Sequence, residues 1–544
     1  GRATSAQLCD LDVRGDDPMT DAPTVRDHLV ARSEDDRPGL LAGDAAWSWR
    51  EVVDASRVRA TLLSSVLSPG SPPHVGVLLE NTPEFLFLLG GAALGGHVVV
   101  GLNHTRRGAA LAADVRRADV QVVVTEESLA PLLDGLDLGV PVLVVGSPAW
   151  RALVEDAESA PRSGTATATG TPAPDDLLML IFTSGTSGEP KAVNVTHEKI
   201  AYPGQFLSER FGLTPDDVAY LSMPLFHSNA IMAGWAPALA VGATIALAPR
   251  FSASGFLPDV RRYGATYANY VGKPLAYVMA TSEMPDDADN PLRLVFGNEA
   301  NERDIEGFGR RFGCTVIDSY SSTENAVIVQ RVAGMPPGSL GRPVDGVAVL
   351  DPATAEPTAD AIFDDDGRLL NAEGATGELV NTHGSGAFAG YYRDDSAEAE
   401  RMRGGMYWSG DLAYRDADGF VYFAGRSADW LRVDGENLAA APIERILLRH
   451  PAVSEAAVYA VPDPAGGDQV VAALLLRDGL TPQTLAAFLD EQDDLSPQAR
   501  PRYVRIVDDL PRTATNKVLK RALAETGGGT TWERTPRGTT YAPI

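Results

Sequence analysis

A chain of 544 residues is longer than one hydrophobic core supports, so its length predicts at least two domains. Its composition, 44% hydrophobic and 22% charged, is that of an ordinary globular protein. The formal net charge of −27 repels nucleic acid and anionic membrane surfaces, which favours work on small molecules. The two cysteines, Cys9 and Cys314, are too few for a disulfide framework or a thiolate metal site, which fits a reducing cytoplasm.

The N-terminal part of the chain predicts neither a secretion signal nor a membrane span. Residues 1–18 carry several aspartates and no apolar segment, and Met19 resembles a natural start. Residues 1–23 are therefore expected to be an N-terminal extension, with disorder as one outcome. The most membrane-like run, residues 85–102, is interrupted by glycines and His97, so it predicts a core helix followed by a buried strand.

From residue 24 to about residue 160, helical stretches alternate with short apolar strands. The strands are expected at residues 74–79, 98–102, 120–125 and 140–145. This alternation is typical of βαβ units on a mostly parallel sheet. Residues 161–174 are rich in Ser, Thr, Gly and Pro and predict a mobile surface loop.

An apolar run, residues 177–182, then ends in a turn of small hydroxyl and glycine residues. Glycines let the backbone approach closely, hydroxyls donate hydrogen bonds, and a lysine adds positive charge, so the turn predicts a nucleoside triphosphate site. The groups offered to the phosphates are Thr183, Ser184, Gly185, Thr186, Ser187, Gly188 and Lys191. The spacing matches neither the Walker pattern nor a dinucleotide fingerprint. A flexible linker is the alternative, which the apolar runs on both sides disfavour.

Further strands are expected at residues 219–224, 243–248, 267–271, 292–296 and 315–317. Polar segments follow the last two strands, at the position where open α/β sheets bind ligands. Tyr320 offers a face for adenine, Thr323 a hydroxyl for phosphate, and Glu324 a carboxylate for Mg²⁺, although an aromatic residue beside Ser and Thr is also common in plain turns. The expected nucleotide contacts here are Gly297, Asn298, Glu299, Ser319, Tyr320, Ser321 and Thr323.

Residues 341–422 change to shorter strands and turns, which predicts a β-rich subdomain, and a smaller α+β unit follows residue 425. Within the subdomain, Asp411 follows an expected tight turn and suits the two ribose hydroxyls, although an isolated aspartate of this kind is often structural. Near the end of the chain, Lys517 lies in a basic segment whose composition alone favours a solvated tail.

Taken in chain order, these segments resemble the adenylate-forming superfamily, which includes acyl-CoA synthetases, aryl-acid ligases, luciferases and nonribosomal adenylation domains. The turn from Thr183 to Lys191 resembles its phosphate loop, and Tyr320 to Glu324 resembles its Tyr-Gly-x-Thr-Glu motif. Gly425-Arg426 and Lys517 match its Gly-Arg pair and its catalytic lysine. The stretches Leu-Phe-His-Ser-Asn and Asp-Trp-Leu-Arg-Val-Asp-Gly-Glu-Asn are similar to those of actinobacterial fatty-acid–CoA ligases.

The resemblance implies an α/β fold with a large N-terminal domain of parallel βαβ sheets and a β-rich subdomain (24–425), and a smaller mobile α+β domain (426–544). The implied cofactors are ATP and Mg²⁺, with Asp411 and Arg426 on the ribose. Lys517 would stabilise the charge that forms when an acid attacks the α-phosphorus. The C-terminal domain would then turn about residues 426–429 and present Gly435 to an acceptor such as CoA. Ala428 departs from the family's usual hinge residue.

The implied acid pocket departs from the family, because side chains replace the usual glycines. Its lining is expected to include His227 as a gate, together with Asn229, Trp235, Ala300, Ser322 and Asn325. A small, polar pocket predicts a small or aromatic acid. A nitrite-activating diazotase of secondary metabolism, with an aryl amine as acceptor, fits such a pocket equally well. A carrier-protein thiol remains a further acceptor, and a non-catalytic nucleotide-binding relative is disfavoured because Lys191, Glu324, Asp411 and Lys517 are all present.

Overall fold

Two compact units make up the chain in the computed structural model. The model describes residues 22–160, 171–183, 190–300, 302–320, 322–332, 334–364, 367–426, 430–433, 436–462, 468–492, 495, 497–512, 518–525, 530–535 and 538–544. The first unit runs up to Asn325 and includes Ala387–Glu398, and the second comprises Ala326–Gly386 and Ala399–Ile544. The chain therefore leaves the first unit, returns to it once and leaves again. The predicted functional boundary between residues 425 and 426 stays a prediction.

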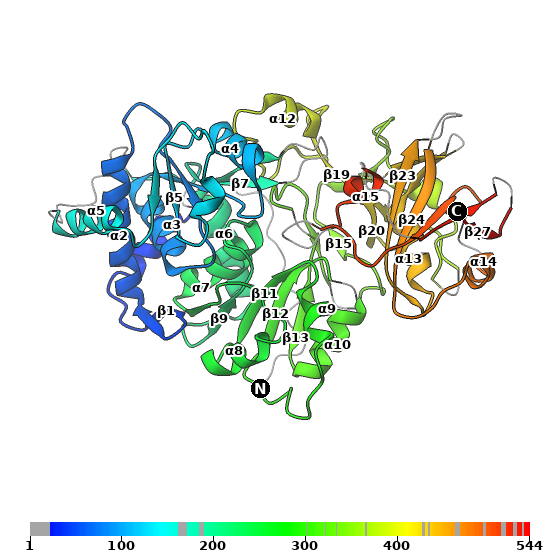
Figure 1. Cartoon of the computed structure of the whole chain (residues 1–544), viewed down its shortest axis with the longest axis horizontal. Helices are drawn as coiled ribbons and strands as arrows, with labels where there is room; N and C mark the ends of the chain where they lie inside the picture. Colours follow the sequence, from blue (N-terminus) through cyan, green and yellow to red (C-terminus); the bar gives the residue numbers. More distant parts are fainter. Residues whose placement is uncertain are drawn as a thin grey trace. The chain divides into compact units, whose positions relative to one another are not determined.

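The first unit contains a six-stranded sheet in the order β6-β5-β3-β4-β7-β8. Two of its strands, β5 and β7, are labelled in Figure 1. Its strands are β3 (His74–Leu78), β4 (Val98–Gly101), β5 (Val122–Thr125), β6 (Val142–Val144), β7 (Leu177–Thr183) and β8 (Lys191–Thr196). Neighbours run parallel except β7 and β8, which pair antiparallel. β3, β4 and β5 are valine-rich and buried along their whole length, as parallel strands covered on both faces are. The strands predicted in this part of the chain are confirmed.

A seven-stranded sheet in the order β13-β12-β11-β9-β10-β1-β2 belongs to the same unit. Its strands are β1 (Pro38–Ala42), β2 (Ala45–Ser48), β9 (Val218–Leu221), β10 (Thr244–Leu247), β11 (Tyr267–Val271), β12 (Leu294–Asn298) and β13 (Thr315–Asp318). Only β1 and β2 pair antiparallel. The accompanying helices are α1 (Val25–Ala31), α6 (His197–Phe211), η2 (Ala230–Trp235), α7 (Ala236–Val241), α8 (Phe256–Tyr263), α9 (Pro274–Met279) and α10 (Glu302–Phe312). This arrangement confirms the predicted α/β class.

The membrane-like run of the sequence is a buried helix, α3 (Pro83–Gly95), followed by strand β4. α3 packs against α2 (Trp49–Val66), and its glycines allow the close approach. A Cβ atom on Gly91 would lie 2.9 Å from the backbone nitrogen of Ala60, which is closer than side chains pack. The helix ends at Gly96, whose φ of 70° suits glycine. No helix in the described part of the chain is long and apolar enough to cross a membrane.

The second unit begins with short strands, as predicted for residues 341–422. A five-stranded sheet contains β16 (Val347–Leu350), β17 (Gly377–Asn381), β19 (Met406–Arg415) and β18 (Met402–Arg403), with β20 (Val421–Arg426) paired to β19. Two strand pairs flank it in sequence, β14 (Val329–Gln330) with β15 (Arg342–Pro343), and β21 (Trp430–Val433) with β22 (Glu436–Ala439). The short helices are α11 (Ala372–Ala375) and α12 (Asp395–Arg401), which begins in the first unit.

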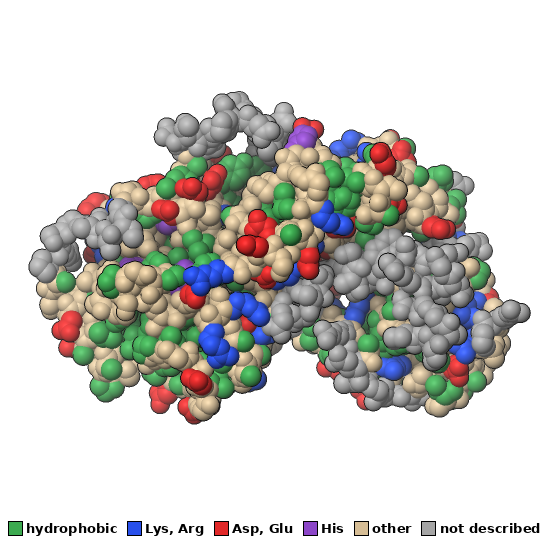
Figure 2. All heavy atoms as spheres, turned by 90° about the horizontal axis from the view of Figure 1, so that it is seen from above, with side chains coloured by type: hydrophobic (Ala, Val, Ile, Leu, Met, Phe, Trp, Pro, Cys, Tyr) green, Lys and Arg blue, Asp and Glu red, His purple; other side chains and the backbone are tan. Residues whose placement is uncertain are grey.

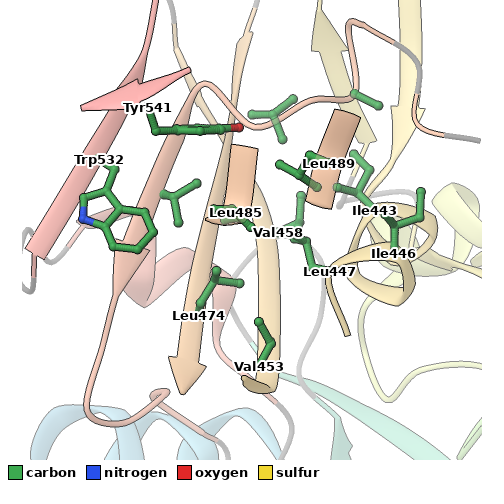
Figure 3. Packing of buried hydrophobic residues seen from close by; sticks show 14 of the residues in the cluster. Ile443, Ile446, Leu447, Val453, Val458, Leu474, Leu485, Leu489, Trp532 and Tyr541 are labelled. Atoms are coloured by element: carbon green, nitrogen blue, oxygen red, sulfur yellow. The ribbon is translucent and has the colours of Figure 1, made fainter. Parts of the chain in front are cut away.

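A second five-stranded sheet, in the order β23-β24-β25-β26-β27, forms the C-terminal part of this unit. Its strands are β23 (Val453–Pro462), β24 (Asp468–Leu476), β25 (Tyr503–Ile506), β26 (Thr530–Arg534) and β27 (Tyr541–Pro543), and its helices are α13 (Ala440–Leu448), α14 (Pro482–Asp490) and α15 (Lys520–Glu525). Figure 3 shows Leu447 of α13 and Leu485 of α14 among the side chains of β23 and β24. The last part of the chain, where no strand was predicted, adds β26 and β27, whose Trp532 and Tyr541 complete this core.

The surface carries both signs of charge. On the face shown in Figure 2, acidic side chains are spread widely and Lys and Arg side chains lie among them. The net charge of −27 is therefore not gathered into one acidic patch on the described part of this face.

Replacing Gly91 tests the close packing of α2 and α3. We expect Gly91→Ala to destabilise the protein by about 1–3 kcal/mol, because its new methyl group meets backbone atoms. Gly374→Ala, in helix α11 with no neighbouring atom within 4 Å of the new methyl group, is the control. Urea unfolding of the full chain measures both variants. Equal stability of the two variants would contradict the packing argument.

Candidate functional site

The predicted phosphate loop joins two paired strands. Thr183 ends β7 and Lys191 begins β8, and the two residues are partners in the antiparallel ladder. From the neighbouring helix α4 (Gly108–Arg117), Arg117 donates a hydrogen bond of 2.7 Å to the carbonyl oxygen of Pro190. Residues 184–189, which include Ser184, Gly185, Thr186, Ser187 and Gly188, lie outside the described residues. Both ends of the loop are thus held by main-chain contacts.

Tyr391 connects the end of this loop to Glu324. Its hydroxyl donates a hydrogen bond of 2.9 Å to Oε1 of Glu324, and the Lys191 ammonium lies 5.4 Å from the centre of its ring. The exposed fractions of Lys191, Tyr391 and Glu324 are 4%, 3% and 9%. A buried ring of this kind attracts the cation and orients the carboxylate at the same time. The structure therefore brings two predicted site residues together through a third that the sequence analysis did not identify.

Tyr391 reaches this position because its segment pairs with the outer edge of β8. Val193 of β8 bridges to Tyr391, the Asn194 N–H donates to the Gly390 oxygen at 3.1 Å, and the Tyr392 N–H donates to the Ala192 oxygen at 2.8 Å. The sequence signal is the pair of tyrosines after Gly390. It carries no information on its own, because only the long-range pairing with β8 places one ring at the site.

The two polar segments predicted to bind nucleotide meet at the carboxyl ends of β12 and β13. Asn298 ends β12, and its Nδ2 donates to the main-chain oxygen of Ser319 at 2.6 Å. Gly297 is required by the neighbouring strand, since a Cβ there would lie 2.2 Å from the Tyr270 oxygen. Glu299 has a φ of 70°, an uncommon left-handed conformation for a residue with a side chain. Tyr320 follows Ser319 directly, whereas Ser321 and Asn301 lie outside the described residues.

The same segments reach the predicted acid pocket. Ser228 directly follows His227 in the chain. Its hydroxyl lies 2.9 Å from the Thr323 hydroxyl and shares a hydrogen bond with it. Asn229 donates to the Tyr270 oxygen at 2.9 Å and to Oδ1 of Asn298 at 3.2 Å. The acid-pocket motif and the nucleotide motif are therefore joined by direct hydrogen bonds within the first unit.

Two polar side chains predicted to line the pocket, those of Asn229 and Ser322, bond within the protein. Asn229 also accepts a hydrogen bond of 2.7 Å from Asn269, and the Ser322 hydroxyl accepts one of 3.3 Å from the Asn325 N–H. Trp235 is buried at the end of η2, a stretch of π-helix, which is a local geometry common at functional sites. The Ala300 N–H is bonded to Asp318 at 2.9 Å. These bonds reduce the polarity that the residues offer to a ligand.

In the second unit, Asp411 and Arg426 are partners on adjacent strands β19 and β20. Asp411 was expected after a tight turn, but this residue lies within strand β19. The irregularity that suggested a turn is Gly410, whose φ of 75° coincides with a hydrogen bond of 2.6 Å from its N–H to Glu378. Lys517, the hinge residues 427–429 and Gly435 lie outside the described residues.

Glu324 fits the predicted role in Mg²⁺ binding. Mg²⁺ is commonly held by one or two carboxylates together with substrate phosphates and water rather than by a cage of protein ligands. Among the described residues, no group of three or more His, Cys, Asp or Glu side chains forms such a cage. A single buried carboxylate, oriented by Tyr391 near the end of the phosphate loop, is the donor set expected for a metal that arrives with a nucleotide.

Family comparison agrees with this geometry. Residues 27–392 match the model of the AMP-binding enzymes, and residues 442–517 match the C-terminal domain of AMP-binding enzymes. The chain belongs to the AMP-binding enzyme family. The predicted membership of the adenylate-forming superfamily is thereby confirmed.

Named relatives of this AMP-binding enzyme span almost its whole length. It is 52% identical to the medium/long-chain-fatty-acid–CoA ligase FadD17 of Mycobacterium tuberculosis, over 93% of this chain and 97% of the relative. It is 49% identical to the steroid-22-oyl-CoA synthetase of Rhodococcus jostii, over 92% and 91%. ATP-bound MatB from Rhodopseudomonas palustris has a similar fold, with a TM-score of 0.78, 25% identity, and 92% and 99% coverage.

Removing the Tyr391 hydroxyl tests the link between Lys191 and Glu324. We expect Tyr391→Phe to raise the Mg²⁺ concentration needed for ATP–pyrophosphate exchange about tenfold, since a hydrogen bond to a charged group contributes about 1.5–3 kcal/mol. Tyr392→Phe is the matched control, because its hydroxyl donates to a different carboxylate, that of Asp119, at 2.8 Å. Magnesium titrations at saturating ATP measure the effect. An equal shift in both variants would contradict a specific role for Tyr391.

Proposed function

We propose that this AMP-binding enzyme is an AMP-forming acid–CoA ligase, which uses ATP to make an acyl-adenylate and then an acyl-CoA. The observation that carries the proposal is the link from Lys191 through Tyr391 to Glu324, which places a cation and a carboxylate at the end of the phosphate loop. The names of the relatives that are 52% and 49% identical, both CoA ligases or synthetases, support CoA as the acceptor.

In the first half-reaction, a carboxylate oxygen of the acid attacks the α-phosphorus of ATP, the bond to the β-phosphate breaks, and pyrophosphate leaves. The loop from Thr183 to Lys191 would hold the phosphates, and the Glu324 carboxylate would hold the metal. Bound Mg²⁺ supplies charge neutralisation on the phosphate oxygens. Lys517 stabilises the negative charge that develops during the displacement.

In the second half-reaction, the thiol sulfur of CoA attacks the acyl carbon and the carbon–oxygen bond to AMP breaks. AMP leaves and the thiol proton passes to solvent. We propose that the C-terminal domain turns about residues 426–429 between the two steps, so that Lys517 gives way to the acceptor. Asp411 and Arg426 would hold the ribose from adjacent strands.

We further propose an acid with a large apolar body, rather than the small or aromatic acid expected from sequence. Asn229, one of the polar residues expected to line the pocket, bonds to the main-chain oxygen of Tyr270 and to the side chains of Asn298 and Asn269. The buried apolar residues Ile231 and Trp235 follow Asn229 in the chain. The relatives named for medium or long fatty acids and for a steroid acid support the same class.

A panel of acids in ATP–pyrophosphate exchange tests this proposal. We expect exchange to depend on an added acid, with medium-chain, long-chain and steroid carboxylates more active than benzoate or anthranilate. Nitrite with an aryl amine, CoA and a carrier-protein thiol are further arms, followed by mass spectrometry of the products. Exchange with nitrite alone would replace the ligase with the diazotase. Exchange with no acid in the panel would support the non-catalytic nucleotide-binding alternative. The location in a reducing cytoplasm, which was expected from the cysteine count, stays a prediction.

Replacing the proposed catalytic lysine separates chemistry from binding. We expect Lys517→Ala to lower the rate of adenylation by about 10²–10³-fold while ATP binding is retained, because its charge acts on the transition state. Lys520→Ala is the control, since the Lys520 ammonium pairs with Glu444 at 2.9 Å. Single-turnover formation of the adenylate measures both. Unchanged turnover in Lys517→Ala would remove this residue from the mechanism.

A further inference from the structure

Helix α6 contains a buried lysine, Lys199, that neither the sequence motifs nor the proposed mechanism uses. It lies in the first turn, where its N–H donates to the side chain of the N-cap residue Thr196 at 3.2 Å. Its exposed fraction is 5%. Both features disfavour an ammonium group, because burial removes its hydration and the first turn of a helix carries partial positive charge.

The hydrogen bonding of Lys199 does not offset this cost. Within the described residues, its ammonium has a contact of 3.5 Å with the main-chain oxygen of Asn194, which is long for a charged donor. Burial lowers the pKa of Lys199 to about 8, and the charge that acts in the opposite direction is that of Glu324. The carboxylate of Glu324 is therefore the compensating group in the free protein.

Two buried charges contact Tyr391, and a third, that of Lys199, contacts the strand with which Tyr391 pairs. Its hydroxyl bonds to Glu324 and its ring faces Lys191, while its main chain pairs with β8 at Val193, next to the residue whose carbonyl contacts Lys199. Glu324 is thus the carboxylate near both cations, Lys191 and Lys199. When Mg²⁺ occupies Glu324, both ammonium groups need another anion, and the triphosphate of the nucleotide supplies it.

We propose that Lys199 is a second buried cation of the triphosphate site: it balances Glu324 in the free enzyme and stabilises the β- and γ-phosphates of bound Mg–ATP. It is a positioning residue for the nucleotide, in addition to the loop lysine Lys191. The inference rests on the proposed ATP-dependent function. It goes beyond that function because it assigns a phosphate-binding role to a position outside the phosphate loop.

Binding measurements without acid test this role. Calorimetric titrations of the full chain with Mg–ATP, Mg–pyrophosphate and AMP compare wild type with Lys199→Met, which keeps the apolar stem and removes the charge. We expect Lys199→Met to bind Mg–ATP and Mg–pyrophosphate about tenfold more weakly, and AMP within about twofold of wild type, because AMP has no β- or γ-phosphate. Arg210→Met is the control, since it removes a positive charge from the last turn of the same helix.

The outcomes separate the two proposals. If wild type itself fails to bind Mg–ATP, the proposed function is wrong. If wild type binds it and Lys199→Met binds it equally well, only the role of Lys199 is overturned. An equal loss of ATP and AMP affinity also overturns it, because a general distortion of the pocket would explain that result.

Thermal unfolding tests the pairing with Glu324 independently of ligands. We expect Lys199→Met and Glu324→Gln each to lower Tm, because each leaves a buried charge without its partner. The double variant is expected to lose less than the sum of the two shifts. Additive shifts in Tm would overturn the pairing. If Lys199→Met alone does not fold, the double variant keeps the test available, and a double variant that also fails to fold would overturn the pairing.

Discussion

The candidate site depends on the pairing of one short segment with the outer edge of strand β8. The Asn194 N–H donates to the Gly390 oxygen and the Ala192 oxygen accepts from the Tyr392 N–H, and these bonds fix the Tyr391 ring between a lysine and a carboxylate. Lys191 and Glu324 are more than one hundred positions apart in the sequence. Pairing at the edge of the sheet, rather than a local sequence motif, therefore brings Lys191, Tyr391 and Glu324 into one set of electrostatic interactions.

This arrangement explains why the charges at the site are tolerated although they are buried. A carboxylate that accepts a hydrogen bond from a tyrosine and a lysine that faces its ring each retain part of the stabilisation that water would give. The remaining imbalance favours a ligand that brings its own cation and several negative charges. Mg–ATP has that composition, whereas a simple anion or a free metal ion has only half of it.

Much of the fold and part of the site follow from the sequence. Valine-rich runs such as Val122–Thr125 pack only as buried strands, and the polar residues after β12 and β13 meet because parallel strands end at one edge. Tyr391 and Lys199 were not found, because their roles arise from contacts with residues far away in the chain. The hydrogen bonds of Asn229 were not foreseeable for a related reason: its side chain is polar, but its partners lie inside the protein and far away in the chain.

The return of the chain to the first unit at Ala387–Glu398 has a consequence for synthesis. Strand β8 is made early, yet one of its edges stays open until residues almost two hundred positions later, Ala389 to Tyr392, have left the ribosome. During that interval the nascent chain exposes unpaired main-chain groups beside Lys191. A gene fragment that stops before residue 389 would leave the same edge permanently uncovered. The shortest self-sufficient form of the first unit therefore extends past the last strand of its two large sheets.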